Sequence, residues 1–198
     1  MITLNNSIIQ QYLTDLGIPV PAGLKLIGIR GCIPVGEDSA SGEISLRGDE
    51  PNIFSDTLGC FGSDFGLWIG TTLPGVVADP PNPKGLAKLC TMEDAGQSWK
   101  FVHGSHHGQY PCLIQGEPIW VRRDGGYLDK GMFAIEIHHA GVDSSDIGSY
   151  SEGCQVFKVL AQWIQFWAKV EASKQDSFEY FLIDGPAFIK WMQSKKLA

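Results

Sequence analysis

A cysteine and two histidines within one stretch of the chain are the residues best suited to chemistry. His138 and His139 follow a segment of alternating apolar residues, and Ser151-Glu152-Gly153-Cys154 comes after a loop of small and polar residues. A neutral histidine can take the proton of a thiol and return it to a leaving amine, because its ordinary pKa of about 6.5 lies close to neutral pH. The pattern therefore predicts Cys154 as a thiol nucleophile with His138 as its base.

The residues around Cys154 suggest how the thiol would be activated. Gly153 permits close approach of backbone and substrate. A strongly apolar helical pattern follows and predicts a helix that begins at Cys154, whose free N–H groups would lower the thiol pKa and hold an oxyanion. From spacing alone, an equal alternative is that Cys154 is a small residue at a helix start and His138 a buried core residue.

Apolar periodicity predicts the elements that must position this site. An alternating strand precedes His138, and short strands separated by Gly and Pro dominate the rest of the chain. We expect helices at 5–16, from Cys154 onward (with its apolar stripe at 159–170) and at 188–196. Strands are expected at 24–33, 58–73 (a hairpin), 99–102, 112–115, 119–122, 133–137 and 180–183, with a turn at 124–126, a loop or edge strands at 34–57 and a loop at 77–85. The fold class predicted is mostly β with packed helices, in a single domain that spans residues 1–198.

Composition excludes several classes of function. The 198 residues are 43% hydrophobic and 19% charged, with 24 glycines and 11 prolines, as in a loop-rich globular protein. The net charge of −7 argues against nucleic acid as a partner, because phosphate binding needs a basic face. No apolar run approaches the roughly 20 residues that span a bilayer, so we expect no membrane insertion.

The spacing of the cysteines and histidines does not indicate a metal centre. Five widely spaced cysteines signal neither a disulfide framework nor a zinc motif, and four of them are expected to be buried. The histidines form two clusters, and the first of them is expected in a polar loop or at a rim. A zinc peptidase that uses both clusters is an alternative, but no HExxH spacing is present. The clusters are His103, His106 and His107, and then His138 and His139.

The motif around Cys154 also carries a resemblance. Ile137-His138, followed by Ser151-Glu152-Gly153-Cys154, resembles the signature of the L,D-transpeptidase catalytic-domain family, in which a strand-end His precedes Ser/Thr-x-Gly-Cys. The longer pattern looks most like the phage- and prophage-associated, lysis-type members. The likeness covers residues 82–183, which would form the catalytic core, whereas residues 1–75 match only loosely.

The resemblance implies a β-sandwich or barrel domain that acts on peptidoglycan stem peptides. Cys154 would attack a peptide bond and form an acyl-enzyme, which water or an amine then releases. His138 would be the base, and the backbone carbonyl of His139 would orient it. Ser151 and Gly153 match supporting positions of the motif. Neither a cofactor nor a metal is implied.

Two positions depart from the family pattern and affect the expected substrate. Glu152 stands where many members carry His, and Val156 stands where many carry Arg or Asn. We expect specificity to differ at these two positions. The candidates to replace the missing substrate-gripping group are Arg122, Arg123 and Gln155, and His107 is a further candidate for substrate binding.

The N-terminal sequence favours cleavage of the cell wall over cross-linking. MITLNNSIIQQYLTDLG lacks the positive and apolar regions of a secretory signal. We therefore expect a protein that is made in the cytoplasm and reaches the wall or periplasm after release or injection. The alternatives are a zinc-dependent peptidoglycan peptidase and a non-catalytic phage or secretion-system wall-binding protein.

Overall fold

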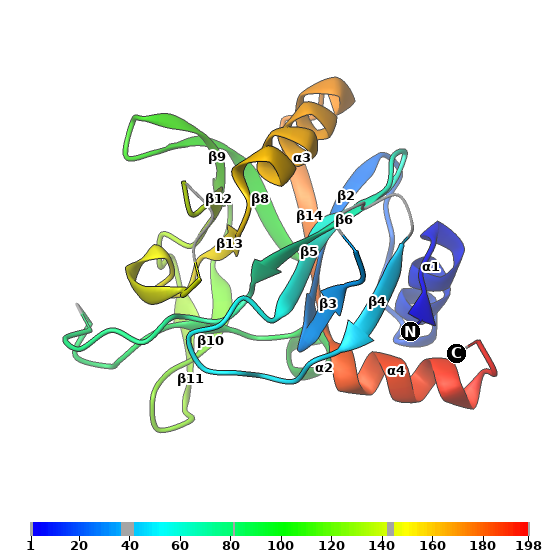
Figure 1. The fold of residues 1–198 in the computed structure, drawn as a ribbon, viewed down its shortest axis with the longest axis horizontal. Helices are drawn as coiled ribbons and strands as arrows, with labels where there is room; N and C mark the ends of the chain where they lie inside the picture. Colours follow the sequence, from blue (N-terminus) through cyan, green and yellow to red (C-terminus); the bar gives the residue numbers. More distant parts are fainter. Residues whose placement is uncertain (1, 37–41, 81, 142–144, 198) are drawn as a thin grey trace.

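The structure is a closed barrel of eight strands with helices packed on its outside (Figure 1). The computed structural model describes residues 2–36, 42–80, 82–141 and 145–197. Around the ring the strands follow the order β12-β13-β6-β5-β2-β14-β8-β9, and β9 pairs with β12 to close it. The barrel strands are β2 (Leu24–Arg30), β5 (Asp56–Gly62), β6 (Gly66–Thr71), β8 (Trp99–His106), β9 (Tyr110–Gln115), β12 (Glu136–His139), β13 (Gln155–Phe157) and β14 (Ser177–Asp184). The prediction of a mostly-β fold with packed helices is confirmed.

Alternate residues of the central strands enter two different cores. On β2, Leu26 belongs to one core with Trp68 and Tyr180, whereas Ile27 belongs to a second core with residues of the N-terminal and C-terminal helices. Successive side chains of a strand point to opposite faces. Both faces of the central strands are therefore buried, and every residue of β2 and all but the last residue of β5 are buried.

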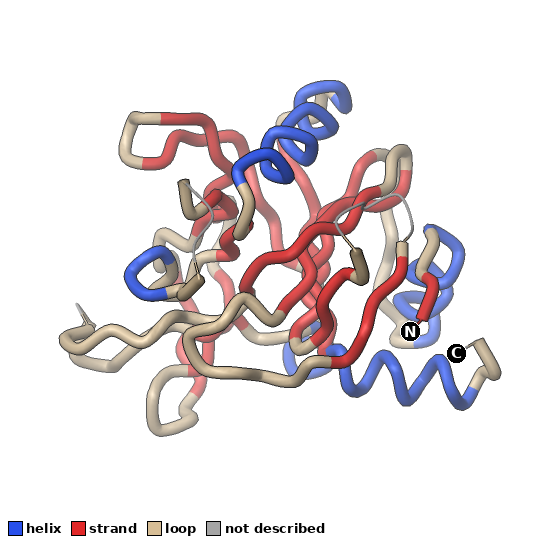
Figure 2. The backbone as a smooth tube through the Cα atoms, in the orientation of Figure 1, coloured by secondary structure: helices blue, strands red, loops and turns tan. Residues whose placement is uncertain are grey.

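In the described part of the chain, the helices lie outside the strands (Figure 2). Helix α1 begins as expected, because the Asn5 side chain accepts a hydrogen bond from Ile8 N–H. Its Tyr12 ring packs on Phe188 of the C-terminal helix at a centroid distance of 4.7 Å. Among the described residues, no helix is both long and apolar enough to cross a membrane. The helices are α1 (Asn6–Asp15), α2 (Met92–Ala95), α3 (Leu160–Ser173) and α4 (Gly185–Ser194), and a 3₁₀ turn, η2, covers Gly148–Tyr150.

Two small sheets extend the barrel. The strand predicted at 24–33 is broken at Gly31, whose φ of +73° suits glycine. The 34–57 segment, expected as a loop or edge strands, supplies Glu43–Leu46, which pairs on both sides and is the middle strand of its sheet. The predicted turn at 124–126 joins the two strands of a hairpin. The first sheet holds β1 (Ile2–Thr3), β4 (Glu43–Leu46) and β3 (Cys32–Pro34), and the second holds β11 (Leu128–Gly131), β10 (Ile119–Arg122) and β7 (Lys88–Leu89).

The helix predicted to begin at Cys154 begins later. Residues 155–157 form β13, which is buried between β12 and β6, and α3 starts only at Leu160. The helical periodicity is confirmed at Trp163, Phe166 and Val170, which are the buried residues of α3. The expected helix N-terminus at the thiol is therefore wrong.

Two further strand boundaries differ from the expected ones. Strand β12 starts at Glu136 instead of 133, because Phe133 N–H and Ile135 N–H donate to the Gln115 side chain. Strand β8 continues to His106, so the first histidine cluster is mostly strand, and the expected loop is only the turn at His107.

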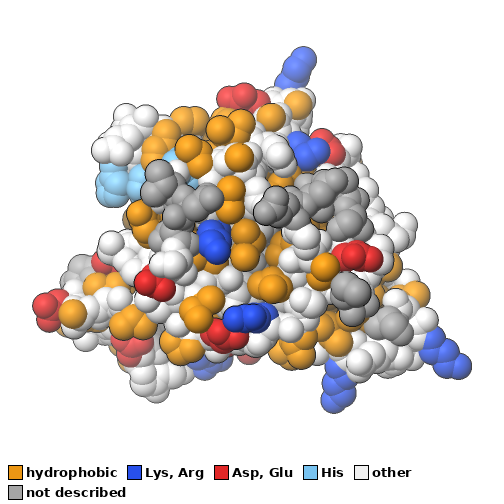
Figure 3. All heavy atoms as spheres, viewed as in Figure 1, with side chains coloured by type: hydrophobic (Ala, Val, Ile, Leu, Met, Phe, Trp, Pro, Cys, Tyr) orange, Lys and Arg blue, Asp and Glu red, His pale blue; other side chains and the backbone are white. Residues whose placement is uncertain are grey.

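On the face shown in Figure 3, charged side chains are dispersed. Lys and Arg side chains stand singly among hydrophobic and acidic ones. Histidine side chains, by contrast, gather at one edge of this face.

A buried carboxylate ties several strands together. Asp56 accepts hydrogen bonds from Gly31 N–H and Thr72 N–H, both at 2.6 Å, and from the Thr72 hydroxyl. Arg30 donates to the same hydroxyl at 3.0 Å and to the carbonyls of Thr72 and Leu89. The network joins the ends of β2, β6 and β7 to the start of β5.

Substituting this carboxylate tests its contribution to stability. Asp56→Ala leaves three buried donors without their acceptor, so we expect the free energy of unfolding to fall by about 3 kcal/mol or more. Urea denaturation followed by circular dichroism measures it. Asp49→Ala, which removes an exposed carboxylate paired with Lys88, is the matched control and should cost less than about 1 kcal/mol. Equal losses in the two variants would contradict a structural role for the network.

Candidate active site

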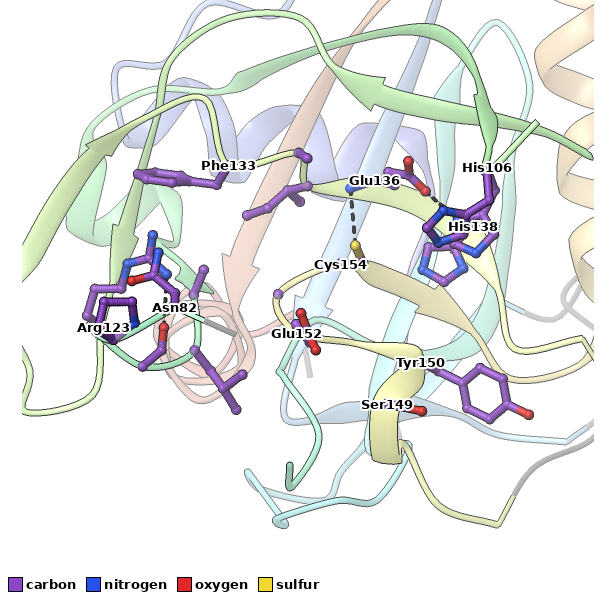
Figure 4. A pocket seen from close by; sticks show the side chains of 18 residues that line it. Asn82, His106, Arg123, Phe133, Glu136, His138, Ser149, Tyr150, Glu152 and Cys154 are labelled. Carbon is purple, nitrogen blue, oxygen red and sulfur yellow. Dashed lines mark hydrogen bonds and ion pairs between the residues drawn. The ribbon is translucent and has the colours of Figure 1, made fainter. Parts of the chain in front are cut away.

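Cys154 and His138 open onto the same cavity, which has a volume of about 690 Å³ (Figure 4). The walls come from residues 82–87, from the end of β8, from residues 133–138 and from residues 149–154. The predicted loop at 77–85 therefore contributes its last residues to the cavity. The loop before Cys154, expected to form a wall of the site, does so through Ser149 and Tyr150, whereas its residues 142–144 lie outside the described part of the chain.

The pairing of β12 with β13 sets the positions of the thiol and the imidazole. The two strands are parallel, with Ile137 beside Gln155 and His138 beside Val156. Cys154 therefore lies beside Glu136, and its Sγ accepts a hydrogen bond from Glu136 N–H at 3.4 Å. Because side chains alternate along a strand, Cys154 and His138 lie on the same outer face of the barrel.

The Ser151-Glu152-Gly153 segment fixes the backbone at Cys154. The Ser151 hydroxyl donates to the Cys154 carbonyl at 2.8 Å and accepts from Gly153 N–H at 3.2 Å. Gly153 has a φ of +144°, and a Cβ there would lie 2.4 Å from the Ala87 carbonyl oxygen. Both residues support the site, but the Gly153 N–H is already used within the turn.

The ring of His138 is oriented by the backbone. Its Nδ1 lies 3.0 Å from the carbonyl oxygen of His139, which confirms the expected contact. The Tyr110 hydroxyl donates to the same carbonyl at 3.1 Å. A carbonyl only accepts hydrogen bonds, so in the neutral ring Nδ1 carries the hydrogen and Nε2 has the lone pair. The backbone of Tyr150 also interacts with this ring and opposes the lowering of its pKa. The side chain of His139 faces elsewhere, and its ring stacks on Tyr110.

Burial keeps both reactive groups neutral. It lowers the pKa of His138 to about 4, against the opposing effect of the His139 carbonyl, and nearby His106 lowers it further. Burial likewise raises the pKa of the Cys154 thiol to about 12, which the Glu136 N–H opposes and the carboxylates of Glu136 and Glu152 reinforce. The expected lowering of the thiol pKa is wrong, because no helix begins at Cys154.

The thiol and the imidazole share the cavity without touching. Among the hydrogen bonds of the described residues, none joins Cys154 Sγ to the His138 ring, and Sγ has the Glu136 N–H as its partner. Catalytic hydrogen bonds are commonly long before substrate binds. The arrangement therefore suits proton transfer that accompanies attack, rather than a preformed thiolate–imidazolium pair.

Only some of the expected substrate-binding residues reach the cavity. His107 and Arg123 line it, and Arg123 lies on the side away from His138, with its guanidinium 4.6 Å from the Phe133 ring centroid. Arg122 points away and donates to the Gly126 carbonyl. Gln155 is fully buried and accepts from the Tyr180 hydroxyl, so neither Arg122 nor Gln155 lines the cavity.

The two departures from the family pattern have different outcomes. Val156 is fully buried against Phe54 and Ile147 and does not line the cavity, so its side chain is not placed to contact a substrate there. Glu152 is exposed and lines the cavity next to the thiol. Of the two positions, Glu152 is therefore the one whose side chain can contact a ligand in the cavity.

Three residues at the site were not expected from the sequence. His106 Nδ1 lies 2.5 Å from Glu136 Oε2, and its ring stacks on the His138 ring at a centroid distance of 4.3 Å. Tyr110 holds the His139 carbonyl, as described above. Glu136 could have been inferred, because it shares a strand face with His138, but His106 and Tyr110 reach the site through long-range strand pairing that spacing does not encode.

Comparisons with known proteins identified no relative of this chain. No protein-family model, curated protein or solved structure matches this chain. The likeness to the L,D-transpeptidase family therefore stays a prediction, and it depends on residues 137–138 and 151–154.

The reactivity of the thiol tests the neutral state of the site. Alkylation by iodoacetamide requires the thiolate, so with a thiol pKa of about 12 the rate at Cys154 should rise about tenfold per pH unit between pH 7 and 9. Peptide mapping by mass spectrometry, with a chelator present, follows Cys154 alone, since the other four cysteines are buried. Cys154→Ser gives the background. A rate that levels off near neutral pH would indicate an activated thiolate instead.

Proposed function

We propose that this protein is a peptidoglycan-directed cysteine enzyme that cleaves stem peptides through an acyl-enzyme on Cys154. The observation that carries the proposal is the shared cavity, in which the Cys154 thiol and the His138 ring lie on one face of the barrel. The His139 carbonyl accepts from Nδ1, which leaves the lone pair of the neutral ring on Nε2 as the proton acceptor. The substrate class comes from the resemblance of the 137–138 and 151–154 motif to the L,D-transpeptidase family.

The chemistry starts from a neutral thiol and a neutral imidazole. As Sγ attacks the substrate carbonyl carbon, the S–H proton passes to Nε2 of His138. The tetrahedral intermediate then loses its amine, which takes that proton, and a thioester to Cys154 remains. Water attacks the thioester with His138 again as base, and this step releases the acid and restores the thiol. An amine acceptor in place of water would give cross-linking.

Glu152 favours substrates that carry a positive charge near the scissile bond. Its exposed carboxylate lines the cavity next to Cys154. The cationic residue in the cavity wall, Arg123, is buried and already held by the Gly85 carbonyl and Asp129. An ammonium group, such as the side chain of a diamino acid in a stem peptide, therefore fits beside Glu152 better than a carboxylate does.

A zinc-dependent peptidase is the second candidate, and one observation favours it. His106, Glu136 and His138 bring their ligand atoms within 4.8 Å of one another. In that mechanism the metal would activate water, and the thiol would be dispensable. A wall-binding protein without activity is the third candidate, and it predicts binding without turnover.

Muropeptide digestion tests the thiol mechanism directly. Purified protein incubated with defined muropeptides should yield products that have lost a terminal residue or a cross-link, detected by mass spectrometry. Cys154→Ala and His138→Gln should each abolish turnover, because the two groups act as a unit. Cys90→Ala and His103→Gln change the same residue types away from the cavity and should retain it.

Other outcomes would contradict this assignment. Full activity of Cys154→Ala would exclude the thiol as nucleophile. Activity lost to a chelator but not to an alkylating agent would identify the metal as catalyst. New dimeric muropeptides would contradict the preference for cleavage, and intact substrate bound to folded protein would favour the wall-binding alternative.

The charge preference has its own test. Glu152→Gln should raise KM for a stem peptide with a free side-chain ammonium by about two- to fivefold, as expected for one exposed ion pair, and should leave kcat unchanged. The control is the same peptide with that amine acetylated, and its KM should be the same for the wild-type protein and for Glu152→Gln. An equal rise in KM for both peptides would assign Glu152 a structural role.

A further inference from the structure

One histidine from each sequence cluster meets a carboxylate at the edge of the cavity. The imidazole nitrogens of His106 and His138 and a carboxylate oxygen of Glu136 all lie within 4.8 Å of one another. His138 is buried, and the side chains of His106 and Glu136 are 20% and 18% exposed. The three groups are therefore accessible from the cavity on one side only.

Three strands of the barrel build this arrangement. Strand β8 ends at His106, and β9 starts opposite it at Tyr110. Strand β9 also pairs with β12, which carries Glu136 and His138 on one face. The rings of His106 and His138 lie nearly parallel, with an interplanar angle of 19°. The His106–Glu136 hydrogen bond holds the carboxylate on the same side.

We propose that His106, Glu136 and His138 form a site for a divalent transition-metal ion of the zinc class, with a fourth position open to the cavity. Two imidazoles and one carboxylate are a ligand set that zinc accepts, whereas calcium and magnesium prefer oxygen ligands alone. Tetrahedral zinc with bonds of about 2.1 Å places its ligand atoms about 3.4 Å apart. Binding therefore requires the His106–Glu136 hydrogen bond of 2.5 Å to open and the more widely spaced ligand atoms, all within 4.8 Å, to approach one another.

Metal binding at this site would exclude the thiol chemistry. A His138 ring that coordinates a metal cannot also take the proton of Cys154, so the loaded protein lacks its base. This consequence depends on the proposed function, whereas the binding of the metal does not. The site thus makes the enzyme reversibly sensitive to zinc, rather than dependent on it.

Direct binding is the first test. Tag-free protein with Cys154→Ser, which removes the cavity thiol, is titrated with ZnCl₂ in competition with a chromogenic zinc chelator. We expect one equivalent to bind, and His106→Gln or Glu136→Gln to weaken binding by more than the ~10- to 100-fold typical of losing an outer-shell partner. His103→Gln, a histidine outside the cavity, is the matched control and should bind as the parent does. Unchanged affinity in His106→Gln and Glu136→Gln, or no binding below millimolar zinc, would overturn the site.

The second test measures turnover of muropeptides with and without zinc. Zinc should lower the activity of the wild-type protein, and a chelator should restore it. In Glu136→Gln the ratio of the rate with zinc to the rate without zinc should be closer to one. Zinc that binds at the site but raises activity would overturn the inhibitory role. If the protein binds zinc at these residues but does not turn over muropeptides, the proposed function is refuted and the metal site stands. If it turns over muropeptides but does not bind zinc there, only the metal site is refuted.

Discussion

The parallel pairing of β12 with β13 is the contact on which both the barrel and the candidate site depend. Strand β13 has only three residues, yet it joins β12 to β6 and so closes the ring. The same register places Cys154 beside Glu136 and sends its side chain to the face that carries His138. A slip of one residue would turn Cys154 toward the barrel interior. Closure of the fold and assembly of the site are thus one structural event.

Burial at this pairing decides the electrostatics of the site. The backbone of residues 136–138 and 154–156 is covered on the inside by the barrel core and on the outside by Val156 and its neighbours. In such surroundings the neutral forms of the thiol and the imidazole are favoured over an ion pair. In the proposed reaction the thiol would therefore be deprotonated only as it attacks, as the nucleophile of a serine hydrolase is.

Local periodicity in the sequence predicted much of this fold but not its closure. Helix α1, the β5–β6 hairpin and β10 follow from caps, alternation and turns that lie within a few residues of one another. Strand β13 was missed because three residues give too little alternation to distinguish a strand from the first turn of a helix. The late start of β12 was also unpredictable, because it is caused by the Gln115 side chain, which is distant in sequence.

The candidate site was predicted where it is local and missed where it depends on long-range pairing. Cys154 and His138 lie within one motif, and they do share a cavity. His106 joins them only because β8, β9 and β12 are neighbours in the barrel, and that neighbourhood makes Glu136 the hub of the site. Its N–H binds the thiol, and its carboxylate binds His106. A single strand residue therefore contacts both the thiol and the histidine cluster, through its backbone on one side and its side chain on the other.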